Sequence, residues 1–524
     1  AKAYAETLGL KFAYATNGKS IIEFDYLTGE TDELDHFPAP TDLWVRLKGS
    51  AELSKADEIL LSPGRTNKTP RYYQDIAINR AVEGILSGKP RLLLTLATGT
   101  GKTLIAAQIA YKLWNMRWTR KTIGGRRPKI LFLADRNFLV DDPYSKDFAI
   151  FGEARHKIQR VVNTSRDMFF AIYQAVDDTE WTPGLYRQYP ADFFDLIIVD
   201  ECHRGSAKEE SSWRRILEYF APAQQIGMTA TPKRNDNVDT YAYFGDPVYT
   251  YSLKQGIEDG FLAPYRVHRV ITTVDAVGWR PSKDELDRFG RPVPDDEYQT
   301  KDFERVIALR ARTKAIAKHL ADFLKGTDRF AKTIVFCVDQ EHAAEMRQEL
   351  VNLNSDLVKK YPDYVCRVTA DEGVIGLTHL GHFQDVDKPS PVILTTSQLL
   401  TTGVDAEMVK NVVLARVVVS RSEFKQIIGR GTRLNVDYGK EYFNIIDFTG
   451  TATRHFADPD FDGEPARIEE VTIDESGEQI GVTETEPSTQ PDTQREDYEL
   501  QDDQNGPGTG ILINEPPPEP RKFY

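Results

Sequence analysis

The 524-residue sequence is poor in cysteine and has no long apolar run. Its three cysteines, Cys202, Cys337 and Cys366, form no spaced cluster, which argues against a disulfide framework. The nine histidines show none of the spacings typical of zinc ligands. The best apolar run, residues 412–419, is interrupted by Arg416 and is far shorter than the roughly 18 residues of a membrane span. We therefore expect no structural zinc site and no contact with a membrane.

The sequence also lacks an initiator methionine and a signal peptide, since it begins Ala-Lys-Ala-Tyr-Ala-Glu within an amphipathic segment. We expect it to be a fragment of a longer protein. Its composition, 40% hydrophobic and 28% charged, is typical of globular proteins. At about 150 residues per domain, its length predicts three or four domains.

The net charge of −14 is concentrated at the C-terminal end. Residues 458–524 contain 19 acidic and 4 basic residues, whereas the rest of the chain contains 61 acidic and 62 basic residues. The larger part is therefore balanced enough to bind a polyanion through local patches.

Four segments follow one another along the chain. Residues 1–65 contain short alternating segments and are expected to be the β-rich end of an upstream domain. Residues 66–255 alternate apolar strands with helical patterns, which predicts a parallel sheet with helices on both faces. Residues 256–455 repeat this alternation, and residues 456–524 have the composition of a flexible linker towards a further domain. The expected strands are Arg91–Leu96, Lys129–Ala134, Met168–Tyr173, Asp195–Val199 and Gln224–Met228, then Lys332–Cys337, Val365–Thr369, Val392–Thr395, Asn411–Ala415 and Tyr442–Ile446.

A glycine-containing loop, Leu-Ala-Thr-Gly-Thr-Gly-Lys-Thr at residues 96–103, separates an expected strand from a helical pattern. Glycines let backbone N–H groups close around phosphate oxygens, and the helix N-terminus adds positive potential. The strict phosphate-loop pattern has glycine where Leu96 stands. We expect Lys102 to reach the β- and γ-phosphates of a nucleotide and Thr103 to hold Mg²⁺. The remaining loop residues expected at the phosphates are Thr98, Gly99, Thr100 and Gly101.

A second motif, Asp200-Glu201-Cys202-His203, ends the apolar strand that starts at Asp195. Its carboxylates are expected at the carboxyl edge of the sheet, where ligands of open α/β sheets bind. We expect Asp200 to hold the metal ion and Glu201 to position the attacking water. Cys202 is expected to be a small residue packed behind this turn.

The second half carries Gln-Ile-Ile-Gly-Arg-Gly-Thr-Arg at residues 426–433, which is expected to open a helix. Arg430 and Arg433 are three residues apart and would then share one helical face. Guanidinium groups match phosphate oxygens in a bidentate manner and remain charged at any working pH. An arginine at the γ-phosphate would stabilise the charge of the transition state.

In order and in kind, these motifs resemble those of the superfamily 2 helicases and translocases. The resemblance implies two tandem RecA-like domains with ATP and Mg²⁺ between them. Arg433 would be the arginine finger, Arg430 a second phosphate contact, and Gln74 the residue that reads adenine. The other implied roles are nucleotide contact for Gly403 and Asp405, coupling or interface for His203, Thr229, Thr231 and Gln426, and nucleic-acid contact for Arg136, Gln174, Thr401 and Thr402.

Within that superfamily, Asp-Glu-Cys-His-Arg at 200–204 and Met-Thr-Ala-Thr-Pro-Lys-Arg at 228–234 resemble the motor subunit of type I restriction endonucleases. The resemblance implies ATP-driven movement on double-stranded DNA, partnership with methyltransferase and specificity subunits, and a bacterial or archaeal cytoplasm. It also implies a nuclease domain before the motor, of which only an end near Tyr4 would be present, and a helical domain after it. Another DNA or RNA helicase of the superfamily, or a non-hydrolysing ATP-gated nucleic-acid clamp, are the alternatives.

Overall fold

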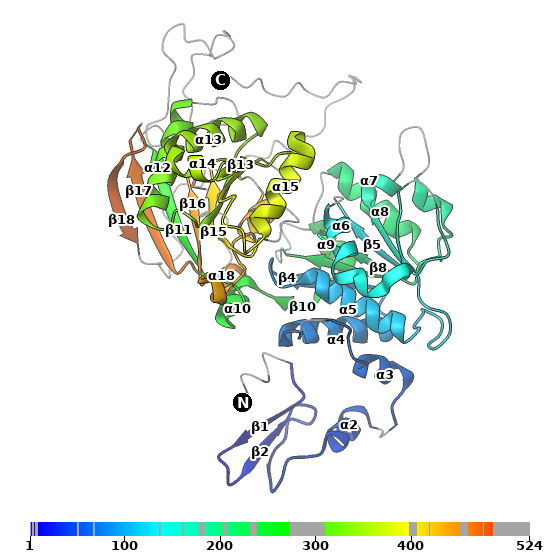
Figure 1. Cartoon of the computed structure of the whole chain (residues 1–524). Helices are drawn as coiled ribbons and strands as arrows, with labels where there is room; N and C mark the ends of the chain where they lie inside the picture. The colour runs from blue at the N-terminus through cyan, green and yellow to red at the C-terminus, as the bar shows by residue number, and fades with distance from the viewer. Residues whose placement is uncertain are drawn as a thin grey trace, which may run out of the picture. The chain divides into compact units, whose positions relative to one another are not determined.

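A computed structural model describes most of the chain (Figure 1). The described residues are 2, 5, 9–49, 52–66, 69–135, 138–159, 162–177, 184–202, 207–230, 238–272, 310–397, 406–418, 420–450, 459–474 and 476–485. The chain divides into two compact units. The first comprises Ala1–Thr95, Gly101–Thr229 and Asn237–Thr250, and the second comprises Leu96–Thr100, Ala230–Asp236 and Tyr251–Tyr524.

The first unit begins with a small antiparallel sheet in the order β1-β2-β3. Its strands are β1 (Phe12–Thr16), β2 (Ile21–Asp25) and β3 (Thr31–Leu34), and the helices α2 (Pro40–Lys48) and α3 (Lys55–Leu61) follow it. The segment after α3 is hydrogen-bonded to a helix of the following domain. The Gln108 side chain accepts from the Arg65 N–H at 2.8 Å and donates to the Arg65 carbonyl at 3.0 Å. Lys112 Nζ likewise donates to the Leu60 carbonyl at 2.7 Å. The end of the segment expected to belong to an upstream domain is therefore hydrogen-bonded to a helix of the first parallel-sheet domain.

A seven-stranded sheet, in the order β10-β4-β9-β8-β5-β7-β6, forms the centre of the first unit. The pairs from β4 to β6 are parallel. Its strands β4, β5 and β8 are nearly continuous apolar runs with buried side chains, as expected for parallel strands covered on both faces. The strands are β4 (Arg91–Leu96), β5 (Ile130–Ala134), β6 (Arg155–Lys157), β7 (Met168–Ile172), β8 (Leu196–Val199), β9 (Gln224–Thr229) and β10 (Pro247–Tyr251).

The five strands expected in this region are confirmed within two residues at each end, whereas β6 and β10 were not predicted. Both are edge strands of the sheet. The helices of this domain are α4 (Tyr72–Leu86), α5 (Lys102–Asn115), α6 (Phe138–Ser145), α7 (Tyr173–Val176), α8 (Ala207–Tyr219) and α9 (Val238–Phe244). Apolar side chains between these helices and the sheet form its core.

The second unit contains an eight-stranded sheet in the order β13-β14-β12-β15-β16-β11-β17-β18. All recorded pairs are parallel except β17–β18. Its strands are β11 (Tyr265–Thr272), β12 (Lys332–Phe336), β13 (Val365–Arg367), β14 (Ile393–Thr396), β15 (Val409–Leu414), β16 (Phe443–Asp447), β17 (Arg467–Ile473) and β18 (Gln479–Thr485). Its helices are α10 (Leu253–Glu258), α12 (Arg310–Gly326), α13 (Gln340–Leu353), α14 (Ser355–Lys360), α15 (Gly373–Gln384), α16 (Arg421–Ile428) and α18 (Pro459–Asp462). The two sheets confirm the predicted α/β class.

The linker predicted from residue 456 onward is wrong for residues 467–485, which form β17 and β18. Composition concealed a period-two pattern, in which Val471 and Ile473 are buried against the sheet. Both acidic side chains of β17 contact basic side chains of the neighbouring strand β11. Glu469 lies 2.7 Å from His268 Nδ1 and Glu470 lies 3.1 Å from Arg269 Nη1.

Among the described helices, none is long and apolar enough to cross a membrane. The cysteines Cys202, Cys337 and Cys366 are buried free thiols.

Candidate active site

The predicted phosphate loop lies between the end of β4 and the start of α5. Gly99 and Gly101 have φ angles of 86° and 83°, in the left-handed region that favours glycine. Leu96, which stands where the strict pattern has glycine, is the last residue of β4 and is fully buried. That position therefore belongs to the strand and its core. Thr100 closes the loop by donating its hydroxyl to the Ala97 carbonyl at 2.6 Å.

Lys102 and Glu201 form an ion pair, with 3.3 Å between Lys102 Nζ and Glu201 Oε1. Their side chains are only 10% and 9% exposed, so water screens the pair weakly. Lys102 starts α5 and Glu201 follows β8, so the contact joins two motifs that are about a hundred residues apart in sequence. The Glu201 carboxylate is therefore bound to the same ammonium group that is expected to bind phosphate.

Asp200 directly follows β8 at the carboxyl edge of the sheet, as predicted. Its N–H donates to the Leu133 carbonyl of β5 at 2.9 Å. Burial, followed by the negative charge of Glu201, raises the pKa of Asp200 to about 7, while the Lys102 ammonium acts in the opposite direction. Burial therefore opposes ionisation of Asp200, and a bound divalent cation would favour its ionised form.

The backbone of this turn is strained. Glu201 has a φ angle of 51°, unusual for a residue with a side chain, and its N–H donates to Asp200 Oδ1 at 3.0 Å. The next residue fixes the conformation, because the Cys202 N–H donates to the Met228 carbonyl at 3.1 Å and its carbonyl accepts from Thr240. A Cβ atom on Gly227 would lie 3.0 Å from Cys202 Sγ, so the thiol is packed tightly behind the turn, as expected.

Gln74 lies beside the phosphate loop. Its Oε1 accepts from the Arg71 N–H at 2.9 Å at the start of α4. A Cβ atom on Gly101 would meet Gln74 Nε2 at 2.7 Å. The predicted adenine-reading amide and the loop are thus neighbours, and a side chain on Gly101 would displace it.

Thr103 and Thr98 are half-buried at the start of α5 and in the loop, respectively. Thr229 ends β9 and is fully buried opposite Thr95 of β4. Since β9 lies between β4 and β8, Thr229 comes from the strand that separates the two nucleotide motifs. That position suits a residue expected to couple sites.

The arrangement predicted for Arg430 and Arg433 is wrong. Helix α16 begins at Arg421 and ends at Ile428, so the two arginines do not share a helical face. Arg430 lies in the following turn, where its Nε donates to the carbonyl of the buried Gln426 at 3.1 Å. Arg433 forms an isolated bridge with Leu262, and its Nη1 lies 3.7 Å from Glu407 Oε1.

Tertiary contacts end this helix. A Cβ atom on Gly431 would meet the Phe443 ring at 2.2 Å, so the chain passes directly against β16. The Thr432 carbonyl accepts from the Ala263 N–H at 2.8 Å. Because of these contacts, the segment after α16 lies against Phe443 of β16 and pairs with the residues that precede β11.

Asp135 and Tyr173 belong to the segments 132–136 and 172–174, which resemble nucleic-acid contacts of superfamily 2 helicases. Tyr173 is buried, and its hydroxyl donates to the Asp200 carbonyl at 3.4 Å. Burial, followed by the charge of Asp135, raises the pKa of Tyr173 well above its ordinary value, so the hydroxyl remains a donor.

Known proteins similar to this chain identify its family. A family model described as "Type III restriction enzyme, res subunit" matches residues 67–234. The chain is 47% identical over 481 residues to the type I restriction enzyme EcoAI endonuclease subunit of Escherichia coli, covering 90% of this chain and 58% of that protein. It is 31% identical over 428 residues to the EcoKI endonuclease subunit of E. coli strain K12, covering 74% and 35%.

A solved fragment described as an HsdR subunit of a type I restriction enzyme from Vibrio vulnificus YJ016 is 60% identical. It aligns with a TM-score of 0.75, covering 92% of this chain and 83% of that chain. The chain belongs to the HsdR, or endonuclease, subunits of type I restriction enzymes. It spans 58% of the EcoAI subunit and 35% of the EcoKI subunit.

Several residues predicted for this HsdR chain lie outside the described residues, so their roles stay predictions. They are Arg136, His203, Thr231, Thr401, Thr402, Gly403 and Asp405. The backbone of Gln174 is described in α7, directly after β7, but its side chain is not.

The N-terminal sheet of the HsdR chain does contain two neighbouring buried carboxylates, Glu23 and Asp25 on β2. Both accept from the Arg46 guanidinium, at 2.8 and 2.6 Å, and Tyr14 donates to Glu23 at 2.6 Å. Hydrogen bonds from Arg46 lower the pKa of Glu23, which keeps it ionised. Both carboxylates are therefore bound to the Arg46 guanidinium. No cluster of three or more His, Cys, Asp or Glu side chains suited to a metal ion occurs in the described residues.

Proposed function

We propose that this chain is the ATP-driven motor of a type I restriction enzyme and moves along double-stranded DNA. The observation that carries the proposal is the Lys102–Glu201 contact beside Asp200, at the edge where the phosphate loop begins α5. A lysine, a metal-type carboxylate and a base-type carboxylate in this arrangement suit hydrolysis of a nucleoside triphosphate.

The phosphate loop and the residues near it would act as follows. The N–H groups of the loop and the Lys102 ammonium would bind the β- and γ-phosphates. Asp200 and the Thr103 hydroxyl offer the oxygen ligands that Mg²⁺ prefers. The ion, when bound, neutralises charge on the phosphates. Phosphate would compete with Glu201 for Lys102, and the released Glu201 carboxylate would then accept a proton from the attacking water.

We propose that Arg433 contacts the γ-phosphate and that Arg430 is a second phosphate contact. Arg433 is one-third exposed, and its planar guanidinium group matches phosphate oxygens in a bidentate manner. Gln74 would read adenine, while Gly403 and Asp405 would contact the nucleotide.

Coupling would pass through His203, Thr229, Thr231 and Gln426, and Arg136, Gln174, Thr401 and Thr402 would hold DNA phosphates. Binding should then depend strongly on salt and weakly on sequence. The type I relatives act as subunits of an enzyme, so we propose methyltransferase and specificity subunits as partners in a bacterial or archaeal cytoplasm.

The deciding experiment measures phosphate release from Mg-ATP on duplex DNA, single-stranded DNA and RNA. Strong stimulation by duplex DNA, without unwinding of a tailed fork, is expected. Stimulation by single strands or RNA together with fork unwinding would favour the alternative of another superfamily 2 helicase. Nucleotide-dependent DNA binding without phosphate release would favour a clamp.

We also propose that residues 1–65 do not hydrolyse DNA, because Glu23 and Asp25 are held by Arg46. Supercoiled plasmid should stay intact with Mg²⁺ and ATP when methyltransferase and specificity subunits are added. Nicked or linear product that disappears in a Glu23→Gln, Asp25→Asn variant would contradict this.

A further inference from the structure

The loop between α5 and β5, residues 116–129, contains six basic and no acidic residues. It forms a small hairpin in which Trp118 bridges Ile123 and the Thr119 N–H donates to the Thr122 carbonyl at 2.7 Å. The Gly124 N–H donates to the Arg117 carbonyl at 3.1 Å. We call this segment the cationic hairpin. Its basic residues are Arg117, Arg120, Lys121, Arg126, Arg127 and Lys129.

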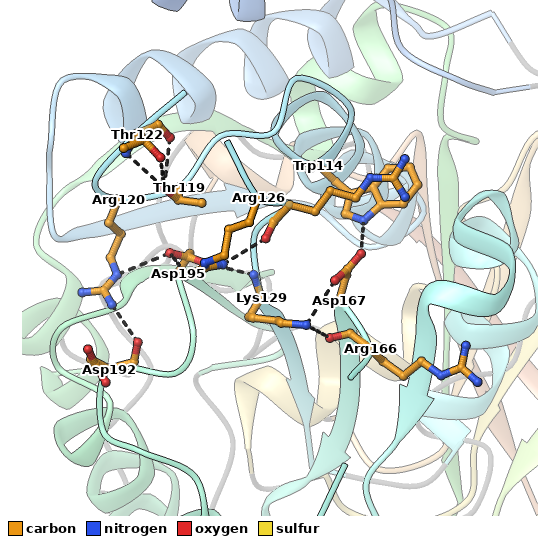
Figure 2. Close-up of polar contacts among 11 residues, drawn as sticks. Trp114, Thr119, Arg120, Thr122, Arg126, Lys129, Arg166, Asp167, Asp192 and Asp195 are labelled. Atoms are coloured by element: carbon orange, nitrogen blue, oxygen red, sulfur yellow. Dashed lines mark hydrogen bonds and ion pairs between the residues drawn. The ribbon is translucent and has the colours of Figure 1, made fainter. Parts of the chain in front are cut away.

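A buried carboxylate fixes one side of the cationic hairpin. Asp195 is 2% exposed and accepts both terminal guanidinium nitrogens of Arg126, at 2.7 and 3.1 Å. It also accepts the Lys129 N–H at 2.9 Å and lies 3.9 Å from Arg120 Nε, as Figure 2 shows. Arg120 donates further to the carbonyls of Asp192 and Pro222, at 2.9 and 2.7 Å. The hairpin is thus held in one conformation before any ligand binds.

Three exposed cations point to a ligand that the hairpin itself does not provide. In the described part of the chain, Arg117, Lys121 and Arg127 have no carboxylate partner. The Arg117 guanidinium donates to the Gly125 carbonyl at 3.5 Å, a long hydrogen bond to a neutral acceptor. The Arg127 guanidinium lies 3.7 Å from the centre of the Trp114 ring, which orients it as a plane. Three fixed or exposed positive charges therefore remain available to an anion.

The position of the cationic hairpin separates it from the motifs expected to hold DNA. The hairpin leads into β5 and so lies at the amino edge of the sheet, whereas the backbone of Gln174 follows β7 at the carboxyl edge. Five strand residues span roughly 16 Å, at about 3.3 Å per residue. The two edges are thus different surfaces of one domain.

The surface chemistry favours a polyanion over a protein partner. The apolar side chains of the hairpin, at Trp118, Ile123 and Pro128, are buried or half-buried, and the exposed positions carry arginine, lysine, threonine and glycine. Protein–protein interfaces have an apolar centre, which this surface lacks. It also offers no exposed ring on which a base could stack. Planar guanidinium groups match phosphate oxygens, which are repeated along a nucleic-acid backbone.

We propose that the cationic hairpin binds the phosphate backbone of duplex DNA at the amino edge of the first parallel sheet, the edge opposite to Asp200, Glu201 and the backbone of Gln174. This proposal rests on the proposed function, since it takes duplex DNA as the substrate. A contact at this edge would hold a DNA segment other than the one the motifs grip, without reading its sequence.

The test is a variant with Arg117→Gln, Lys121→Gln and Arg127→Gln, and the control is Lys89→Gln, an exposed lysine that precedes β4 at the same edge. Affinity for a long duplex is measured over a range of salt concentrations. Three lost phosphate contacts should reduce the slope of log K against log salt by about 2 to 3. The maximal ATP hydrolysis rate at saturating DNA should be unchanged, and the control should match the original chain.

The Lys121→Glu variant guards against misfolding, because Lys121 makes no recorded contact that could be lost, and it should weaken duplex binding by itself. An unchanged salt slope in the triple variant would overturn the proposal. So would normal binding to free duplex combined with lost assembly with methyltransferase and specificity subunits, which would make the hairpin a protein interface. Absence of duplex-stimulated ATP hydrolysis in the original chain would instead count against the proposed function.

Discussion

The two parallel sheets hold their phosphate-type side chains in different ways. In the first unit, Lys102, Asp200 and Glu201 are nearly buried, and the Lys102–Glu201 contact and a strained turn fix them. In the second unit, Arg430 and Arg433 follow a helix end, and Arg433 is one-third exposed beside a distant Glu407. The first set is held by short contacts within the core, whereas Arg433 of the second set is more exposed to solvent.

The largest effect is expected from Lys102→Ala, because the substitution removes the positive charge that faces the β- and γ-phosphates. It also leaves Glu201 buried without its ammonium partner. ATP turnover should fall to background, a loss of at least roughly 10³-fold. Phosphate release in the presence of duplex DNA measures this, with Lys89→Ala as the exposed-lysine control. Turnover near that of the control would remove Lys102 from the site.

Arg433→Ala tests the second sheet. If Arg433 meets the γ-phosphate only as charge develops, the maximal rate should fall roughly 10³-fold while ATP affinity changes little. Rapid-mixing hydrolysis and equilibrium nucleotide binding separate the two quantities. Arg430→Ala is the matched variant, with a smaller loss of rate expected. Loss of affinity at an unchanged maximal rate would make Arg433 a ground-state ligand, and Arg430 would become the candidate finger.

Glu201→Gln should lower the rate on the order of 10²-fold or more, because the amide keeps the shape of the side chain and cannot accept the proton. ATP affinity should be equal or higher, since the carboxylate that competes with phosphate for Lys102 is gone. Nucleotide binding measured beside single-turnover hydrolysis tests both statements. Weaker binding with a normal rate would contradict the competition between Glu201 and phosphate.

The smallest effect concerns the core of the second unit, through His319 of α12. Burial lowers the pKa of His319 to about 4, and the nearby His268 and Lys318 act in the same direction against Asp322 and Glu469. In the unfolded chain the pKa of His319 is near its ordinary value of 6.5, so the unfolded state binds a proton at a higher pH than the folded state does. The free energy of unfolding therefore decreases as pH falls from 6.5 towards 4.

The resulting destabilisation should reach roughly 2 kcal/mol at pH 5. Thermal unfolding at pH 7 and pH 5 should therefore show a smaller drop in Tm for His319→Gln than for the original chain. Equal drops in the two proteins would show that His319 does not carry this pH dependence.

Much of the fold followed from local pattern. Continuous apolar runs such as β4 and β8 predict buried parallel strands, because both faces of each strand must be covered. The loop at 96–103 and the acidic motif at 200 were recognised from residue types alone, because phosphate binding needs glycine backbone and a lysine at fixed spacing. The departure from the strict pattern at Leu96 does not alter the loop, because Leu96 is the last residue of β4.

What sequence could not provide depends on contacts between distant segments. Strand β17 pairs with β11, and its side chains Val471 and Ile473 are buried in the core beside it. Composition alone does not reveal such a pairing with a strand that lies far away in the sequence. The helix expected at 426–433 ended early because Gly431 lies against Phe443.

The sequence by itself therefore determined which residue types reach the carboxyl edge of the first sheet, because strand direction follows from chain order. Only the tertiary structure decided which charges meet. Lys102 pairs with Glu201, Arg46 with Glu23 and Asp25, and Arg126 with Asp195, leaving the outer cations of the hairpin exposed. Charge pairing depends on distance and burial, and segments far apart in sequence set both.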